Sequence, residues 1–320
     1  MRFRTELIPN KSHYTIQYRD PMVLMGSCFS DNLGERLQKS RFKVLVNPLG
    51  TFFNPATAAW LMERISSSQA VEAHELCKRD DVYVHHQFHS RFNHTEKEVI
   101  LQNINRAIHD TRSFLASARF VFLTLGTSWV YEKLESQTIV SNCHKMHPSL
   151  FQKKLLTLTQ ICESLQQFSQ SLQQLNPDCN LILTLSPVRH LKDGFENNQI
   201  SKSLLRAAIY ECMQQSPDIS YFPAYELVLD DLRDYRFYAE DLLHPNSLAV
   251  NYIWEKFTDC YMDEDTRLNI QKADEISQYL AHRPVTGSTV DKTTQDKMKD
   301  KIQQLNPRLG IPFDENMNGI

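Results

Sequence analysis

The stretch VLMGSCFSDNLGERL, residues 23–37, decides how the chain is organised. An apolar run stops at Gly26-Ser27-Cys28, and a polar segment that can form a helix follows at once. Apolar runs without polar alternation are typical of strands buried on both faces of a sheet. A strand that passes directly into a helix is the first part of a β-α-β unit. The stretch therefore predicts an α/β protein with a glycine, a hydroxyl and a thiol at its first strand-to-helix turn.

The same alternation continues along the chain. Five short apolar runs end at turn-forming or small residues, at 22–25, 42–46, 119–125, 180–185 and 219–222. Segments with helical spacing or helix-start signals lie between and after them, at 31–40, 56–65, 96–118, 156–175, 198–215 and 247–261. We expect a flavodoxin-like, doubly wound and mostly parallel five-stranded sheet, whose first helix begins at a Ser30 or Asp31 cap. Ligands of such folds bind at the carboxyl ends of the strands.

Two segments interrupt the alternation. Residues 71–94 form an insertion rich in histidine and aromatic side chains. Residues 128–147 contain two apolar runs, at 129–131 and 138–140, that suggest a hairpin.

The composition turns charged beyond residue 262. We expect one domain over residues 1–262 and a charged, partly helical C-terminal tail over 263–320. Within the tail, helical patterns stand at 275–281 and 293–304, and a linker at 283–292 separates them.

The overall composition narrows the class of protein. The 320 residues are 41% hydrophobic and 23% charged, which predicts a packed core, and the net charge of -3 gives no reason to expect nucleic acid or a membrane as partner. No apolar run resembles a signal peptide or approaches the roughly 20 residues that span a bilayer. Seven scattered cysteines without a CxxC pair favour reduced thiols. We therefore expect a cytoplasmic protein without a cofactor, and leave its oligomeric state open.

Three residues form a candidate catalytic group. Asp241 and His244 are three apart, just before the last helical segment of the domain, so the carboxylate can orient the imidazole. The other ring nitrogen can then take a proton from a hydroxyl. Ser27 lies at the carboxyl end of the first expected strand, where such a hydroxyl is needed. The amides of Ser27 and Cys28, at the helix start, are candidates for binding an oxyanion.

The sequence from Gly26 to Ser30 resembles the Gly-Ser-Cys-Phe-Ala signature of the GSCFA family, which is similar to the SGNH/GDSL hydrolases. Five further stretches resemble that family: NPLGTFFNP (47–55), LTLGTSWVYE (123–132), NCHKMHPSLF (142–151), LSPVRHLKDGFENNQISKSLL (185–205) and YFPAYELVLDDLRDYRFYAEDLLHPN (221–246). The resemblance covers roughly residues 5–262, and the combination of motifs is more specific than any one of them.

The resemblance implies roles for individual residues. Ser27 matches the nucleophile, and Asp241 and His244 match the final Asp-x-x-His of the hydrolases. Gly50 resembles the glycine whose amide helps to bind the oxyanion, and Gly126 matches the glycine of the third motif.

One position departs from the hydrolase pattern. The third motif continues there to an asparagine that donates to the oxyanion, whereas Gly126 is followed by Thr127-Ser128-Trp129. Thr127 or the distant Asn142 is a candidate replacement. Loss of one such donor typically costs about 2.7–4 kcal/mol of transition-state stabilisation.

Each of these residues also has a simpler interpretation. Ser27 is equally suited to be a helix cap, and His244 to be a solvated residue at a helix start. Cys28 is a second candidate nucleophile, because a helix N-terminus lowers the pKa of a thiol. Arg189 is a candidate to bind a carboxylate or phosphate of the substrate, or to form a structural ion pair.

The histidine-rich insertion allows two interpretations. Zinc is bound by such side chains, yet no recognised ligand spacing is present, and we expect no metal. We expect instead that the insertion lines the substrate cleft. The histidines concerned are His85, His86, His89 and His94, with His144 and His147 further along the chain.

Three functions remain open. The first is a serine-dependent esterase that removes an O-acyl, for example O-acetyl, group from a carbohydrate or small molecule through Ser27, His244 and Asp241. The second is an O-acyltransferase that uses the same residues and an acyl-CoA donor. The third is a non-catalytic module that binds a glycan or a partner in the same cleft.

Overall fold

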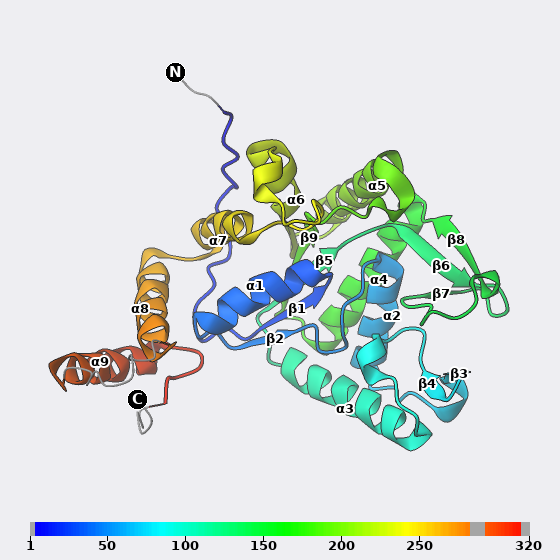
Figure 1. Ribbon diagram of the computed structural model, residues 1–320, viewed down its shortest axis with the longest axis horizontal. Helices are drawn as coiled ribbons and strands as arrows, with labels where there is room; N and C mark the ends of the chain where they lie inside the picture. Colours follow the sequence, from blue (N-terminus) through cyan, green and yellow to red (C-terminus); the bar gives the residue numbers. More distant parts are fainter. Residues whose placement is uncertain (1–3, 282–291, 315–320) are drawn as a thin grey trace.

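A parallel five-stranded sheet forms the centre of the computed structural model, which describes residues 4–281 and 292–314 (Figure 1). Its strands, in the spatial order β2-β1-β5-β9-β10, confirm the doubly wound arrangement expected from the sequence. Each strand lies on or within one of the five predicted runs, apart from the terminal Gly26 of the first. They are β1 (Met22–Gly26), β2 (Val44–Val46), β5 (Phe120–Leu125), β9 (Asn180–Leu185) and β10 (Ile219–Phe222).

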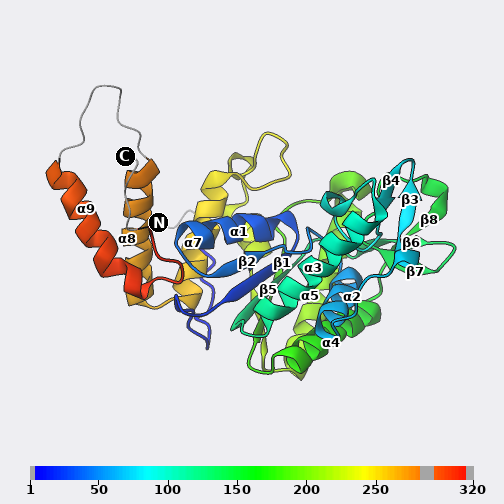
Figure 2. The ribbon, with the colours of Figure 1, turned by 90° about the horizontal axis from the view of Figure 1, so that it is seen from below.

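Helices cover both faces of the sheet, because successive residues of its central strands are apolar on both sides (Figure 2). In β1, Val23 and Met25 belong to one core, and Met22 and Leu24 belong to the other. The first core is closed by α2 (Pro55–Ser66), α3 (Lys97–Leu115), α4 (Leu158–Leu175) and α5 (Gly194–Gln215). The second is closed by α1 (Cys28–Lys39) and α7 (Ser247–Tyr261).

The start of α1 differs from the prediction. The helix begins at Cys28, and its cap is Ser27 rather than Ser30 or Asp31. Ser30 is inside the helix, where its hydroxyl donates to the carbonyl of Met25 and bonds the hydroxyl of Thr124. These contacts hold the start of α1 against the ends of β1 and β5.

Two small sheets come from the segments that interrupt the alternation. The predicted hairpin is confirmed as β6 (Trp129–Lys133) and β7 (Thr138–Val140). The sequence analysis did not identify β8 (Phe151–Leu155), which pairs with β6 although Gln152 and Lys153 are exposed. The other insertion contains the hairpin β3 (Cys77–Arg79) and β4 (Val82–Val84).

A short helical segment precedes the loop that carries His244. It consists of α6 (Ala224–Glu226) and a π-helical turn, Leu227–Leu232, and ends at Arg233 in a left-handed conformation. The sequence analysis did not identify this segment, although its apolar residues pack into the core that α1 and α7 close.

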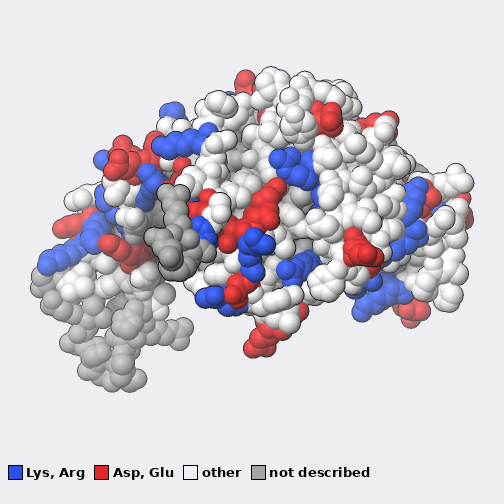
Figure 3. Space-filling view, turned by 90° about the horizontal axis from the view of Figure 1, so that it is seen from above, with Lys and Arg blue, Asp and Glu red and all other residues white. Residues whose placement is uncertain are grey.

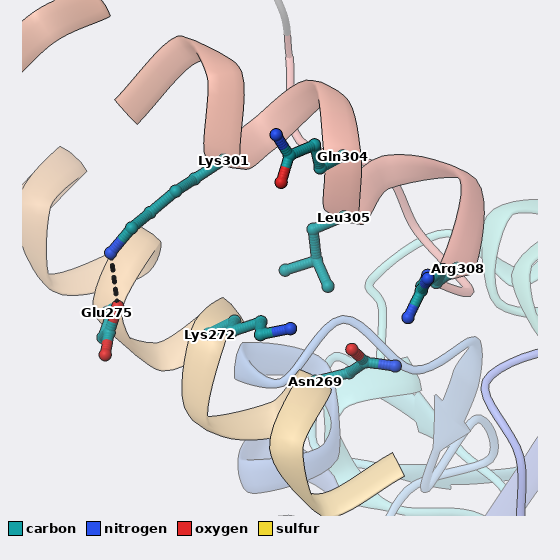
Figure 4. A pocket seen from close by; sticks show the side chains of 7 residues that line it. All are labelled: Asn269, Lys272, Glu275, Lys301, Gln304, Leu305 and Arg308. Carbon is teal, nitrogen blue, oxygen red and sulfur yellow. Dashed lines mark hydrogen bonds and ion pairs between the residues drawn. The ribbon is translucent and has the colours of Figure 1, made fainter. Parts of the chain in front are cut away.

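The tail begins with a longer helix than predicted. Helices α8 (Glu264–Ala281) and α9 (Lys292–Leu305) pack together, while most of the expected linker lies outside the described residues. Between them lies a cavity of about 350 Å³, bordered by the Lys301–Glu275 ion pair (Figure 4). The amide of Ile311 donates to the carbonyl of Arg41, so the tail contacts the chain just before β2. It therefore lies away from the carboxyl ends of the strands (Figure 1).

Acidic and basic side chains are interspersed over the face seen in Figure 3, and neither sign dominates it. Among the described residues, no helix combines the length and the apolar character needed to cross a membrane.

Gly26 provides a test of how closely β1 and β5 approach. A Cβ at Gly26 would lie 2.1 Å from the carbonyl oxygen of Thr124, and the backbone has φ +118°. We expect Gly26→Ala to lower the free energy of unfolding by about 3 kcal/mol or more in urea titrations. Gly194→Ala is the matched control: Gly194 has φ +82° but no atom within 4 Å of the added Cβ, so a loss of about 1 kcal/mol is expected. Equal losses in the two variants would contradict the steric account.

Candidate active site

Several loops meet at the carboxyl edge of the sheet. The backbone amide of Arg189, after β9, donates to the carbonyl of Leu243 at 3.3 Å, which joins the β9 loop to the loop before α7. The amide of Phe52, after β2, donates to the carbonyl of Gly26 at 3.0 Å. The segments concerned are 26–28, 47–53, 126–128, 186–190 and 238–246.

The structure brings Asp241 and His244 together. Oδ2 of Asp241 lies 2.6 Å from Nδ1 of His244, while Oδ1 accepts the amides of Leu243 and His244 at 2.9 and 3.0 Å. The amide of His244, then that of Leu243 and the imidazole, lowers the pKa of Asp241 to about 2. A carboxylate at Nδ1 favours the tautomer with its proton on Nδ1 and the lone pair on Nε2. Both side chains are nearly half exposed, so the imidazole is accessible.

Ser27 has a structural role that is visible in its contacts. Its side chain is 0% exposed, and its Oγ accepts the amide of Phe29 at 3.3 Å as the cap of α1. Its own amide donates to the carbonyl of Thr124 at 3.1 Å, which removes it from the expected oxyanion donors. Within the described residues, no hydrogen bond joins Ser27 to His244.

Cys28 is the first residue of α1 and is partly exposed. Its thiol lies beside the amides of Cys28 and Phe29, which lower its pKa, as does the charge of Lys202. Burial, and next the charge of Asp31, outweigh these effects, so the pKa of the thiol is raised. Of the expected oxyanion donors, the amide of Cys28 stands at a helix start, where no preceding turn supplies a carbonyl acceptor.

Lys202 is a buried cation at this edge that the sequence analysis left without a role. It is 1% exposed, and its Nζ donates to the carbonyl of Ser186 at 2.6 Å. The ammonium lies 5.4 Å from the centre of the Tyr225 ring. Burial lowers the pKa of Lys202 to about 7, while Cys28 opposes that shift. A lysine on the apolar face of α5, three residues before the buried Leu205, is the signal that could have identified it.

His190 lies over Gly126 and was likewise left without a role. A Cβ at Gly126 would be 2.9 Å from Nε2 of His190, so the glycine leaves room for the ring. Nε2 is buried and has no hydrogen-bond partner among the described residues. Burial, and then the charges of Lys202 and His244, lowers the pKa of His190 to about 4. The ring is therefore neutral at physiological pH and lies within electrostatic range of Lys202 and His244.

The other donors expected for an oxyanion are occupied by the fold. The amide of Gly50 donates to Asn47, and those of Gly126 and Thr127 both donate to the carbonyl of Phe53. The hydroxyl of Thr127 bonds that of Ser201 and accepts the amide of Trp129. In the part of the chain that the structure describes, these three backbone amides all have acceptors, so they shape the edge of the sheet and none is free to bind an oxyanion.

Asn142 and His144 are hydrogen-bonded within the insertions. Oδ1 of Asn142 accepts the amide of His144, and the carbonyl of Asn142 contacts Nδ1 of His86. The ring of His144 lies 3.0 Å from the carbonyl of His85, and burial lowers its pKa to about 4. No contact of these two residues reaches His244 or Ser27 within the described chain.

The histidine-rich insertion reaches the carboxyl edge through His89, whose Cβ would be 2.1 Å from a Cβ added at Gly50. Among the described residues, no group of three or more histidine, cysteine, aspartate or glutamate side chains is placed to hold a metal ion.

Arg189 lies next to the loop that carries His244. Its guanidinium carbon is 4.4 Å from the centre of the Tyr238 ring and 5.3 Å from that of Tyr235. Within the described residues, it has no carboxylate within ion-pair distance. The structural ion pair considered for Arg189 is therefore not formed, and two aromatic rings hold its charge instead.

The low pKa of Lys202 predicts a pH dependence of stability. Below pH 7 the ammonium of Lys202 is charged in both the folded and the unfolded protein, and the cost of burying the charge is fully present. As the pH rises toward the pKa of a lysine in the unfolded chain, the folded protein loses this proton first, and folding becomes more favourable. We expect the unfolding free energy of the wild type to rise by about 2 kcal/mol between pH 7 and 9, relative to Lys202→Met. Urea titrations at pH 7 and pH 9 measure the unfolding free energy of both proteins. If it changes equally in the wild type and in Lys202→Met, the burial of the Lys202 charge does not explain the pH dependence.

Comparison with known proteins finds one matching family and several similar solved structures. The GSCFA family matches residues 21–257. Similar solved structures include a carbohydrate esterase family 3 protein from Talaromyces cellulolyticus, with 8% identity and a TM-score of 0.35, over 79% of this chain and 98% of that one. The acetyl xylan esterase Est2A from Butyrivibrio proteoclasticus has 8% identity and a TM-score of 0.38, over 77% and 64% of the two chains. No curated protein sequence matches. The family match spans most of the chain, which therefore belongs to the GSCFA family.

Proposed function

We propose that this protein cleaves acyl esters through a covalent acyl-enzyme formed at the turn after β1. The observation that carries the proposal is the Asp241–His244 pair, whose 2.6 Å contact fixes an accessible imidazole at the carboxyl edge. A carboxylate held by two backbone amides remains ionised and stabilises the imidazolium that forms during catalysis.

In this proposal Nε2 of His244 takes the proton of the nucleophile and later gives it to the leaving alcohol. The nucleophile comes from the turn Gly26-Ser27-Cys28, and Ser27 is the residue that the sequence predicts. Oγ of Ser27 would have to leave the amide of Phe29 to attack. Water as the second acceptor gives hydrolysis, and an alcohol gives acyl transfer.

The proposed substrate is a small-molecule or carbohydrate ester with a negative charge near the acyl group. Arg189 supports this choice because its charge lies beside the His244 loop without a carboxylate partner among the described residues. Tyr235, which is 57% exposed, adds an aromatic surface next to it. Guanidinium groups bind carboxylates and phosphates through paired hydrogen bonds.

His244→Ala tests the proton-transfer role. We expect kcat/KM for 4-nitrophenyl acetate to fall by roughly 100-fold or more, since general acid–base groups contribute about that much. His74→Ala is the matched control, because His74 also lies beside a carboxylate, Glu72, but is highly exposed. We expect its rate to equal that of the wild type. Equal rates in all three proteins would refute the proposed function.

Arg189→Gln tests the proposed substrate class. The assay compares an aryl acetate that carries a carboxylate on the alcohol part with its neutral methyl ester. We expect KM for the charged ester to rise roughly 10-fold, with little change for the neutral one. Arg206→Gln is the control, since Arg206 also lies over a tyrosine ring but is paired with Glu226. A similar change with both esters would contradict recognition of the charge.

A further inference from the structure

We infer that the attacking atom is Sγ of Cys28 rather than Oγ of Ser27, so that the acyl-enzyme is a thioester. The inference rests on the proposed function and deepens it, because it replaces the predicted nucleophile and leaves the roles of His244 and Asp241 unchanged.

The two neighbouring side chains differ in access. Ser27 is 0% exposed, and its hydroxyl oxygen already accepts the amide of Phe29. Cys28 is partly exposed, at the same turn and one residue further toward the helix. A nucleophile has to reach a carbonyl carbon, and of these two only the thiol meets that condition without a change in the cap of α1.

The electrostatic surroundings also favour Cys28 over Ser27 as the nucleophile. The thiol of Cys28 lies beside the first amides of α1, where the partial positive charge of a helix start favours a developing thiolate. Lys202 adds a second positive charge from the core, and among the described residues the one hydrogen bond of its ammonium goes to the carbonyl of Ser186. A buried ammonium with spare donors is unusual, and a negative charge formed at Cys28 would balance it.

Electrostatic contacts connect the thiol to the base. Lys202 acts on both Cys28 and His190, and His190 is within range of His244. His190 in turn packs on Gly126, at the end of the strand next to β1. Lys202 and His190 therefore lie at the same carboxyl edge as the thiol and the Asp241–His244 pair, within electrostatic range of them.

The proposed reaction has two balanced steps. Sγ of Cys28 bonds to the acyl carbon as its proton passes to Nε2 of His244, and the ester C–O bond then breaks as the alcohol takes that proton. Water next attacks the thioester, giving a proton to His244; the C–S bond breaks, the thiol is reprotonated, and the acid is released. Because burial raises the pKa of the thiol, a base is needed in the first step.

Ser27 has a positioning role in this scheme. Its hydroxyl oxygen caps α1, and its amide joins the turn to β5, so Ser27 holds the amides that face the thiol. Glycine is nearly as good a cap as serine. Ser27→Gly therefore removes the hydroxyl and keeps the helix start, which makes it a better test than a larger side chain at this buried position.

The experiment identifies the acylated atom. Wild type, Ser27→Gly, Cys28→Ala, Cys28→Ser and Cys143→Ala are mixed with 4-nitrophenyl acetate, quenched in acid, digested and examined by mass spectrometry. Neutral hydroxylamine distinguishes the adducts, because it removes an acetyl group from a thiol much faster than from a hydroxyl. Cys143 is the matched control, since it is also partly exposed, and burial raises the pKa of its thiol to about 11.

We expect a hydroxylamine-sensitive acetyl group on Cys28 in the wild type, in Ser27→Gly and in Cys143→Ala. Cys28→Ala should form no adduct and lose at least 100-fold in kcat/KM, with an unchanged circular dichroism spectrum. Cys28→Ser should carry a hydroxylamine-resistant acetyl group at position 28, so that the inference does not depend on the folding of the alanine variant.

An acetyl group on Ser27, or full activity in Cys28→Ala, would overturn the inference and leave the proposed function intact. If the wild type neither turns over 4-nitrophenyl acetate nor forms an adduct, and His244→Ala behaves in the same way, both the proposed function and the inference are refuted. Acetylation of Cys143 as fast as that of Cys28 would show ordinary thiol reactivity and would also overturn the inference.

Discussion

The close approach of β1 and β5 at Gly26 is the constraint on which the rest of the site depends. Gly26 lies against the carbonyl of Thr124, which also accepts the amide of Ser27. The side chain of Asn47 accepts the amide of Gly26 and donates to Asp31, so β1, the loop after β2 and the first turn of α1 are tied together. A side chain at Gly26 would separate the strands. The start of α1, its first amides and the thiol beside them would then lose their positions relative to His244.

Burying the charged ammonium of Lys202 lowers the free energy of unfolding of the folded protein. Desolvation of an ammonium costs several kcal/mol unless a partner compensates it. The carbonyl of Ser186 and the ring of Tyr225 supply part of this compensation, and the lowered pKa shows that it is incomplete. A protein that needed only a filled core at this position would be better served by methionine. In the proposed reaction this charge has a use, because the thiol of Cys28 and the ring of His190 lie within its electrostatic range.

The sequence predicted the doubly wound five-stranded sheet and most of the helices, because buried strands and amphipathic helices have strong periodic signals. It missed β8, where exposed Gln152 and Lys153 hide the pairing with β6, and it began α1 too late, because Ser30 also resembles a cap. Asp241 and His244 were found since their contact is local. The environments of Ser27, Cys28 and Lys202 could not be predicted from the sequence. The position of Ser27 depends on the approach of β5, whose Thr124 accepts its amide. The partners of Lys202 are Ser186, in the loop after β9, and Tyr225, in α6.

The edges of the central sheet have a consequence for the behaviour of the protein in concentrated solution. Unpaired strand edges are templates for pairing with other chains. Here the two edge strands, β2 and β10, are the shortest of the five. The C-terminal tail contacts the chain just before β2: the amide of Ile311 donates to the carbonyl of Arg41, and the guanidinium of Arg41 lies 3.8 Å from the centre of the Phe313 ring. The short edge strands thus present few backbone groups for edge-to-edge association, and the tail lies beside the start of one of them.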